Sequence, residues 1–296
     1  MKLLLTGAYP YTQEQIRKIE EMGHTVEFLQ QESDPISNPE TLEGVIGNGL
    51  FLYHAIEKFS RLRYIQLTSA GFDRVPMEYV KKHGITIHNA RGVYSVPMAE
   101  FALGGVLQLY KQSRFFMKKQ EAHQWEKHRG VLELYGKSVL IVGCGSVGTE
   151  CAKRFAAFGC RVFGVDIFPY ETVDYEAIYP LSACEDALKE SDIVVLTLPL
   201  TKESEHFFDE ARFAKMKDGA VLVNIARGAV VDTCALIEAL KNKLFGAVLD
   251  VFEEEPLSAD HPLWEMENTI LTPHNSFVGE GNGDRLFDLI CRNLER

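Results

Sequence analysis

The sequence predicts an α/β protein that consists of two doubly wound domains, each a parallel sheet covered by helices. Apolar runs with the pattern of strands alternate with helix-like runs over most of the chain. Short links between them favour parallel sheets, in which each crossover contains a helix. The length of 296 residues corresponds to about two domains of roughly 150 residues each. A glycine-rich turn joins a strand to a helix near the middle of the chain.

The first part of the chain is predicted to alternate strands and helices. A helix at 12–23 ends at Gly23, and a second helix ends at Gly84, because glycine is a common residue just after a helix. Short apolar runs bounded by turn residues are typical of strands. We expect such strands within residues 2–8, 24–30, 44–49, 63–71 and 85–90.

The segment 96–117 is predicted to form one long helix. Its apolar residues cover nearly the whole circumference, and such a helix is usually buried on several sides. Gly104 and Gly105 each cost roughly 1 kcal/mol in a helix interior, which suggests that another helix approaches the backbone closely. The apolar surface exceeds what one core can bury, so we expect a homodimer through this helix.

The alternation of strands and helices resumes at Lys137 and continues to about residue 275. We place the domain boundary near residues 92–96. The first domain is then residues 1–94, and the second is residues 95–279. A final helix at 280–296 is expected to return to the first domain.

Composition and charge argue against several classes of protein. The net charge of −11 would repel the phosphates of a nucleic acid, and no apolar run approaches the roughly 20 residues needed to cross a bilayer. The N-terminal run shows no cleavage signal of small residues, so we expect a strand there and no signal peptide. The six cysteines have neither paired nor metal-ligand spacing. We therefore expect no metal site, and reduced thiols in the cytoplasm.

The most specific segment is the run 137–166. An apolar strand ends at Gly143, and Gly143, Gly145 and Gly148 form the pattern GxGxxG before a predicted helix. The first glycine permits a tight turn, the second lets the backbone approach a pyrophosphate, and the third lets helix and strand pack closely. The helix N-terminus offers N–H groups and the positive end of a dipole to the phosphates. The run therefore predicts a Rossmann dinucleotide-binding domain.

An acidic residue at the end of the next strand indicates which dinucleotide binds. Asp166 lies 18 residues after Gly148, close to the roughly 20 residues expected for a carboxylate that binds the adenosine ribose hydroxyls. NADP would need a cation for its 2′-phosphate, and Asp166 would repel that group. Residues 167–188 contain neither lysine nor arginine, so the sequence favours NAD.

Three charged or titratable residues follow later strands of the second domain: Arg227, Glu255 and His274. Ligands bind at the carboxyl ends of parallel strands, so we expect these groups to converge beside the nicotinamide. A guanidinium can hold a carboxylate with two hydrogen bonds. A histidine can protonate a carbonyl oxygen as hydride arrives at carbon, and a carboxylate on its other nitrogen fixes the tautomer. The set suits reduction of a 2-keto acid.

Each of these residues also has a purely structural interpretation. An arginine at a strand end is usually an ion-pair partner, and a histidine after a proline is often structural. An acidic run is usually a solvated loop, and spacing alone does not choose among Glu253, Glu254 and Glu255.

Five motifs stand in one order along the chain: LTSAGFDRV, VGCGSVG, NIARGAVVD, DVFEEEP and LTPHN. In order and spacing they resemble those of the D-isomer-specific 2-hydroxyacid dehydrogenase family, and the similarity covers nearly the whole chain. The resemblance implies that Arg227 binds the substrate carboxylate and carbonyl. It also implies that Glu255, the residue before the proline, orients His274, which acts as the acid/base.

The resemblance implies further contacts and a dimer built around the cofactor domain. The backbone of Ser69, Ala70 and Gly71 would hold the substrate carboxylate from a flavodoxin-like first domain. Asp250 would face the nicotinamide amide. The cofactor-binding residues expected in the second domain are Gly143, Gly145, Ser146, Val147, Gly148, Asp166, Pro199, Thr201, Ala226 and Asp250.

The expected function is an NAD-dependent 2-hydroxyacid dehydrogenase that acts as a 2-keto acid reductase. The alternative is a non-catalytic NAD(H)-sensing protein on the same fold. A formate-type dehydrogenase is excluded, because its histidine partner would be glutamine. Where the family usually has small residues after the histidine, this chain has Ser276 and Phe277. This difference affects the shape of the site on the nicotinamide side. The identity of the 2-keto acid does not follow from the sequence.

Overall fold

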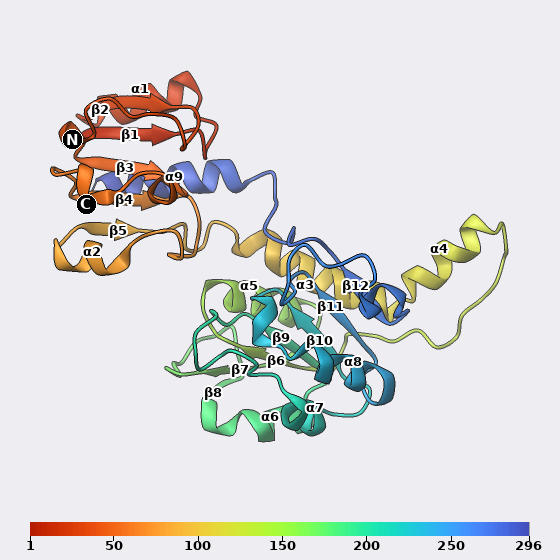
Figure 1. Cartoon of the computed structure of the whole chain (residues 1–296). Coiled ribbons are helices and arrows are strands. Elements are labelled where there is room, and N and C mark those ends of the chain that lie inside the picture. Colours follow the sequence, from red (N-terminus) through yellow and green to blue (C-terminus); the bar gives the residue numbers. More distant parts are fainter. Residues whose placement is uncertain (296) are drawn as a thin grey trace. The chain divides into compact units, whose positions relative to one another are not determined.

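The computed structural model describes residues 1–295, which form two compact units (Figure 1). Unit 1 combines Met1–Tyr94 with the C-terminal segment from Gly279, and unit 2 is Ser95–Val278. Each unit is an α/β sandwich around one parallel sheet. The predicted fold class is thereby confirmed.

The sheet of unit 1 has five parallel strands in the order β2-β1-β3-β4-β5. This is the flavodoxin-like order. Its strands are β1 (Lys2–Thr6), β2 (Thr25–Leu29), β3 (Gly44–Gly47), β4 (Tyr64–Leu67) and β5 (Thr86–His88). Its helices are α1 (Gln13–Glu21), α2 (Met77–Lys82) and α9 (Asn282–Leu294), with short 3₁₀ turns η1 (Pro39–Thr41), η2 (Leu50–Leu52) and η3 (Ile56–Lys58).

The C-terminal helix α9 completes the core of unit 1. Its residues Leu286, Phe287 and Ile290 are buried in one cluster with Leu3 and Leu5 of β1. The helix is strongly amphipathic in sequence, and the sheet face receives its apolar side. A chain segment from the far end of the sequence thus covers a sheet built from the first ninety residues.

Unit 2 contains a seven-stranded parallel sheet in the order β12-β11-β10-β9-β6-β7-β8. Six of these strands follow the Rossmann order 3-2-1-4-5-6 when counted from β6, and β12 extends the edge. The strands are β6 (Ser138–Val142), β7 (Arg161–Asp166), β8 (Ala177–Pro180), β9 (Ile193–Leu196), β10 (Val221–Asn224), β11 (Gly246–Leu249) and β12 (Thr269–Leu271).

Helices cover both faces of the unit 2 sheet. The helices α3 (Ser95–Tyr110) and α5 (Ser146–Ala157) pack on one face, and α6 (Cys184–Glu190), α7 (Glu210–Lys215) and α8 (Thr233–Asn242) pack on the other (Figure 1). The four central strands β6, β9, β10 and β11 are almost entirely buried and apolar, as expected for a parallel sheet covered on both sides. The remaining elements are α4 (Ser113–Glu121) and the 3₁₀ turns η4 (Leu181–Ala183), η5 (Gly228–Val230) and η6 (Pro262–Glu265).

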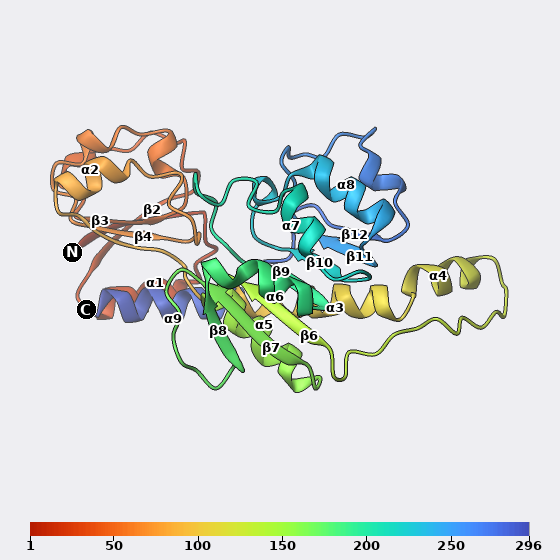
Figure 2. The ribbon, with the colours of Figure 1, turned by 90° about the horizontal axis from the view of Figure 1, so that it is seen from below.

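The long helix predicted at 96–117 is divided in the structure. Helix α3 ends at Tyr110, Gln112 adopts a left-handed conformation with φ of +55°, and α4 then runs out from the sheet (Figure 2). Most apolar side chains of α3 are buried in unit 2 itself. The sheet and α5 cover much of the apolar surface of α3, whereas Val96, Met98, Phe101 and Leu107 are only partly buried. The expected homodimer through this stretch stays a prediction.

The glycine pair in α3 has a different neighbour from the one expected. A Cβ atom on Gly105 would lie 2.5 Å from Cγ1 of Val248, whereas a Cβ on Gly104 would meet nothing within 4 Å. The close approach therefore comes from strand β11, and only Gly105 requires it.

Within residues 1–295, the chain forms no helix with the length and apolarity that a membrane crossing requires. The six cysteines are free thiols, and Cys234 is exposed while the others are buried.

Candidate active site

The glycine-rich turn lies between β6 and α5 and has the geometry that a dinucleotide requires. Gly143 has a φ of +98°, which strains any residue with a side chain. A Cβ on Gly148 would lie 2.3 Å from the carbonyl oxygen of Gly143, so helix and turn pack backbone to backbone. A Cβ on Gly145 would meet nothing within 4 Å, and no side chain caps α5 at this residue. The helix N-terminus therefore fits a pyrophosphate.

Asp166 ends β7 beside this turn. Its Oδ2 accepts a hydrogen bond from the Cys144 amide at 2.8 Å, and its Oδ1 accepts one from the Phe168 amide at 2.9 Å. The hydroxyl of Tyr170 donates to the Cys144 carbonyl at 2.6 Å. These bonds fix the carboxylate against the glycine-rich turn, where an adenosine ribose would bind.

Arg227 lies three residues beyond the end of β10. The side chain of Asn224, the last residue of that strand, accepts from the Ala226 amide and donates to the Arg227 carbonyl, both at 3.1 Å. The Arg227 side chain is half-buried, and its Nη1 donates to the Ala226 carbonyl at 2.8 Å. It forms no ion pair with any carboxylate of residues 1–295. A partly desolvated guanidinium without a protein counterion can bind an external carboxylate.

The structure brings Glu255 and His274 into direct contact. Nδ1 of His274 lies 2.8 Å from Oε2 of Glu255, and both side chains are more than a third exposed. Oε1 of Glu255 accepts the Phe252 amide at 3.0 Å, which fixes the carboxylate. With Nδ1 held in this way, Nε2 is the nitrogen left for proton transfer. Glu253 forms its hydrogen bonds with other residues. Of the three glutamates, Glu255 is therefore the one in contact with His274.

Asp250 follows β11 and is 1 % exposed. Its carboxylate accepts hydrogen bonds from Thr272 Oγ1 at 2.6 Å and from the amides of Asn275 at 2.8 Å and Ser276 at 2.9 Å. The His274 amide donates to the Asp250 carbonyl at 2.8 Å. Asp250 therefore holds the turn that carries His274, as Asn224 holds the turn that carries Arg227. The sequence analysis predicted neither of these two roles. The signal was available in both cases: a polar side chain where a buried strand ends.

The residues after His274 give this turn an aromatic border. The Phe277 ring lies edge-on to the imidazole with 6.1 Å between ring centroids, and Phe277 is 41 % exposed. This aromatic ring narrows the space beside His274.

The remaining expected site residues lie at other strand ends. In the loop after β9, Ser204 Oγ accepts from the Thr201 amide and donates to the Pro199 carbonyl, both at 2.7 Å. Ala226 is buried next to Arg227. In unit 1, the segment 69–71 follows β4, and Asn89 Nδ2 donates to the Ala70 carbonyl at 2.6 Å. Arg227, Glu255, His274 and the expected cofactor residues therefore all belong to unit 2, and Ser69, Ala70 and Gly71 belong to unit 1.

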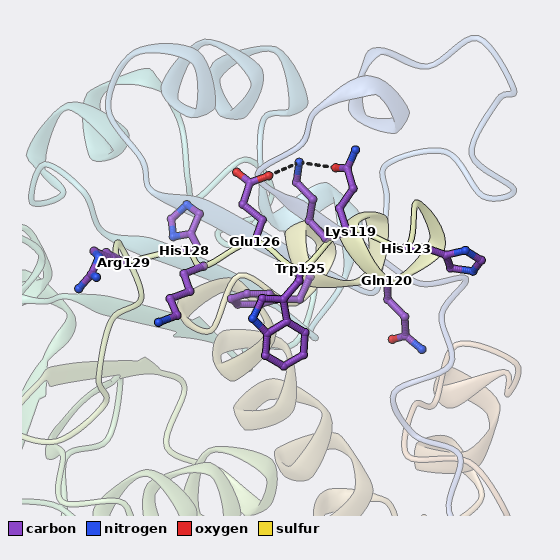
Figure 3. A pocket seen from close by; sticks show the side chains of 10 residues that line it. Lys119, Gln120, His123, Trp125, Glu126, His128 and Arg129 are labelled. Carbon is purple, nitrogen blue, oxygen red and sulfur yellow. Dashed lines mark hydrogen bonds and ion pairs between the residues drawn. The ribbon is translucent and has the colours of Figure 1, made fainter.

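Unit 2 also has a surface hollow of about 690 Å³. It is lined by α4 and the segment that follows, including Lys119, Trp125 and His128 (Figure 3). None of its lining residues is among the expected site residues, so we do not assign the reaction to it.

A Rossmann sheet with a GxGxxG turn and an acid at the end of its second strand defines an NAD-binding domain, and the histidine–carboxylate pair and the arginine are groups suited to a dehydrogenase. The comparisons with known proteins agree. Residues 103–276 match the model of the "D-isomer specific 2-hydroxyacid dehydrogenase, NAD binding domain". The chain belongs to the D-isomer specific 2-hydroxyacid dehydrogenase family, a family of oxidoreductases that act on 2-hydroxy acids.

Individual relatives cover most of the chain. A glyoxylate reductase of Thermofilum pendens is 37 % identical over 242 residues, which is 79 % of this chain and 71 % of the relative. The D-lactate dehydrogenase of Aquifex aeolicus, solved with NAD and lactic acid, superposes with a TM-score of 0.77 at 27 % identity and covers 99 % of this chain and 94 % of its own. A D-isomer specific 2-hydroxyacid dehydrogenase of Xanthobacter autotrophicus, solved with NADPH and MES, has a TM-score of 0.80 at 27 % identity and covers 100 % and 94 %.

Proposed function

We propose that the protein reduces a small 2-keto acid to the 2-hydroxy acid, with His274 as the proton donor. The observation that carries this proposal is the 2.8 Å contact between His274 Nδ1 and Glu255. It lies in the same unit as a half-buried arginine that pairs with no carboxylate of residues 1–295. These are the groups that a keto acid needs: an anion clamp and a positioned acid.

The roles of the side chains follow from their chemistry. When bound, the nicotinamide cofactor supplies the hydride that adds to the carbonyl carbon. Arg227 binds the substrate carboxylate and polarises the carbonyl through its planar fork. His274 gives the Nε2 proton to the carbonyl oxygen, so that one hydride and one proton convert ketone to alcohol. Glu255 orients the ring, and in the reverse direction His274 accepts the proton.

The cofactor is held by the glycine-rich turn and Asp166. We propose contacts from Gly143, Gly145, Ser146, Val147 and Gly148 to the pyrophosphate, and from Asp166 to the ribose hydroxyls. The other proposed contacts are made by Pro199, Thr201, Ala226 and Asp250. The fixed carboxylate of Asp166 supports NAD over NADP, because a 2′-phosphate beside it would be repelled.

We assign substrate binding in part to unit 1, so that residues 1–94 with the segment from Gly279 are the substrate domain and residues 95–278 the cofactor domain. The backbone of Ser69, Ala70 and Gly71 follows a parallel strand, where ligands of such sheets bind. Several relatives are named glyoxylate reductase, which makes glyoxylate the first substrate to test.

We also propose that the protein works in the cytoplasm as a homodimer. The free thiols support a reducing compartment. Exposed apolar side chains on α4 and the segment after it support self-association: Met117 is 60 % exposed and Trp125 is 98 % exposed.

The test is a panel of keto acids with NADH and NADPH, scored by kcat/KM. We expect steady oxidation of NADH with glyoxylate, hydroxypyruvate or pyruvate. His274→Gln should reduce kcat on the order of 100-fold or more, as loss of a general acid does, while NADH affinity is kept. His83→Ala, on the unit 1 surface, is the matched control. A protein that binds NADH but turns over no keto acid would be the non-catalytic sensor instead.

A further inference from the structure

The segments that carry Arg227 and Glu255 are in direct backbone contact. A Cβ on Gly228 would lie 1.8 Å from the carbonyl carbon of Phe252 and 2.4 Å from the amide nitrogen of Glu253. No side chain fits there, so the residue after Arg227 packs against the peptide two to three residues before Glu255. The spacing of the two segments therefore bears directly on the spacing of two proposed active-site groups.

One residue of a third loop is bonded to both segments. The amide of His206 donates to the Ala229 carbonyl at 2.7 Å, and its Nε2 lies 2.9 Å from Oε2 of Glu253. Ala229 is two residues after Arg227, and Glu253 is two residues before Glu255. His206 adopts a φ of +48°, a conformation uncommon for a residue with a side chain. Its bonds thus hold a backbone conformation that would otherwise be unfavourable.

Glu253 extends the connection to a helix. Its other oxygen, Oε1, accepts the amide of Thr233, the first residue of α8, at 2.8 Å. The carboxylate therefore joins the loop after β9, the segment after β11 and the start of α8. All of these elements belong to unit 2.

The charges around His206 favour its protonated form. The hydrogen bond to Glu253 raises the pKa of His206 above its ordinary value, and the nearby charges of Asp232 and Glu205 add to this effect. Burial raises the pKa of Glu253, but hydrogen bonds from Thr233 and His206 outweigh it, so this pKa lies below its ordinary value. The ion pair therefore persists above the ordinary pKa of histidine and below the ordinary pKa of glutamate.

We propose that His206 is a positioning residue: its ion pair with Glu253 sets the spacing between the Arg227 segment and the Glu255 segment, and thereby between the anion clamp and His274. The assignment rests on the proposed function of Arg227, Glu255 and His274. His206 itself touches none of the reacting atoms in this scheme. Its effect passes through the two segments that it joins.

The pH dependence has a definite sign. The contribution of His206 is complete below the ordinary histidine pKa of 6.5, and it is lost as pH rises through the raised pKa of the folded protein. The contribution of Glu253 is complete above the ordinary glutamate pKa of 4.5 and is lost as pH falls through its lowered pKa. The connection is therefore strongest in mildly acidic solution and weakens in alkaline solution.

The test uses variants that separate the backbone of His206 from its side chain. His206→Asn keeps a residue that tolerates a positive φ but has too short a side chain for the ion pair. Glu253→Gln keeps an acceptor for Thr233 but removes the charge. Glu238→Gln, which breaks the 2.7 Å pair with Lys241 on the surface of α8, is the matched control.

We expect His206→Asn to lower kcat/KM for the keto acid by about 10- to 100-fold, the range in which a misplacement of about 1 Å acts. The loss should include a higher KM for the keto acid with unchanged NADH affinity. Glu253→Gln should show a smaller loss of the same kind, and Glu238→Gln should match wild type. A loss confined to NADH affinity, or no loss in His206→Asn, would overturn the positioning role.

Hydrogen exchange followed by mass spectrometry provides a readout that does not depend on activity. His206→Asn should speed amide exchange in segments 226–233 and 251–256 and leave 138–166 unchanged. In wild type, raising the pH should speed exchange in the same two segments by more than the pH dependence of intrinsic amide exchange. In His206→Asn, this additional increase should be absent. Unchanged exchange in both segments would overturn the proposal. Faster exchange in an enzyme that reduces no keto acid would instead contradict the proposed function.

Discussion

Single side chains at strand ends determine the chemistry proposed for this protein. Arg227, Glu255 and His274 follow three different strands, and each is held by hydrogen bonds from its own neighbourhood. Asn224 and Asp250, both 1 % exposed, brace the turns that carry Arg227 and His274. Buried polar groups of this kind are costly unless every bond is made, so they keep the active groups in one geometry.

Arg227→Lys tests the anion clamp at this scale. Lysine keeps the charge but loses the planar fork that binds a carboxylate through two bonds. Losing a charged hydrogen bond of about 1.5–3 kcal/mol predicts a fall in kcat/KM of roughly 10- to 100-fold, with little change in NADH affinity. Steady-state kinetics and NADH fluorescence titration measure the two quantities. Wild-type activity in this variant would remove Arg227 from substrate binding.

Glu255→Gln tests the partner of His274. The amide keeps the size of the carboxylate but supplies one acceptor atom where Phe252 and His274 now use two. We expect kcat to fall on the order of 100-fold, as when a general acid loses its orientation. Glu254→Gln is the control in the same acidic run and should match wild type. Equal effects in both variants would mean that the run acts only through its total charge.

At the scale of elements, the proposed cofactor site is built from one strand–turn–helix unit and the strand that follows it. The β6–α5 turn needs glycine at 143 for its φ of +98° and at 148 for the close approach of the helix. The next strand ends in Asp166, whose two oxygens accept the Cys144 and Phe168 amides. The carboxylate is therefore preorganised before any ribose arrives.

Asp166→Ala tests this arrangement. Removing the carboxylate should weaken NADH binding by roughly 10-fold, the value of about one net hydrogen bond. It should also lower the ratio by which NADH is preferred to NADPH, because the 2′-phosphate of NADPH is then no longer repelled. Dissociation constants for both cofactors, measured by fluorescence, give the ratio. A wild-type protein that already prefers NADPH contradicts the assignment of Asp166.

At the scale of the whole molecule, the two units have separate sheets and separate cores. Unit 1 is discontinuous in sequence, because α9 covers a sheet face formed at the start of the chain. Unit 2 carries both the cofactor turn and the three proposed active-site groups. The arm formed by α4 and the residues after it carries exposed apolar side chains on its outer part.

The dimer prediction belongs to this scale. Light scattering of wild type at micromolar concentration should give twice the mass of one chain. A Met117→Glu/Trp125→Glu double variant places two charges on the exposed arm and should shift the protein toward the monomer, because charges are depleted from the cores of interfaces. Glu238→Gln again serves as the control. A monomeric wild type would refute self-association.

Much of the fold could be predicted from local pattern. Strand and helix positions follow from apolar periodicity and from glycines after helices, both of which depend on residues close in sequence. The break at Gln112 could not be predicted in this way, since the apolar pattern continues past it. In the structure, Gln112 has a positive φ, and α3 packs on the sheet and on α5. The neighbour of Gly105 is likewise a strand and not a helix, because the chain folds back over 143 residues to place Val248 there.

The sequence by itself determined the α/β class, the dinucleotide turn, the acid at Asp166 and the family, because these depend on residue types at short, regular spacings. Only the tertiary structure decided which polar residues brace the turns and how His206 joins two segments through Glu253, 47 residues away. Those outcomes depend on hydrogen bonds between residues brought together by the packing of parallel strands. The geometry of such bonds is set by the folded sheet, and no periodic pattern of residue types in the sequence indicates it.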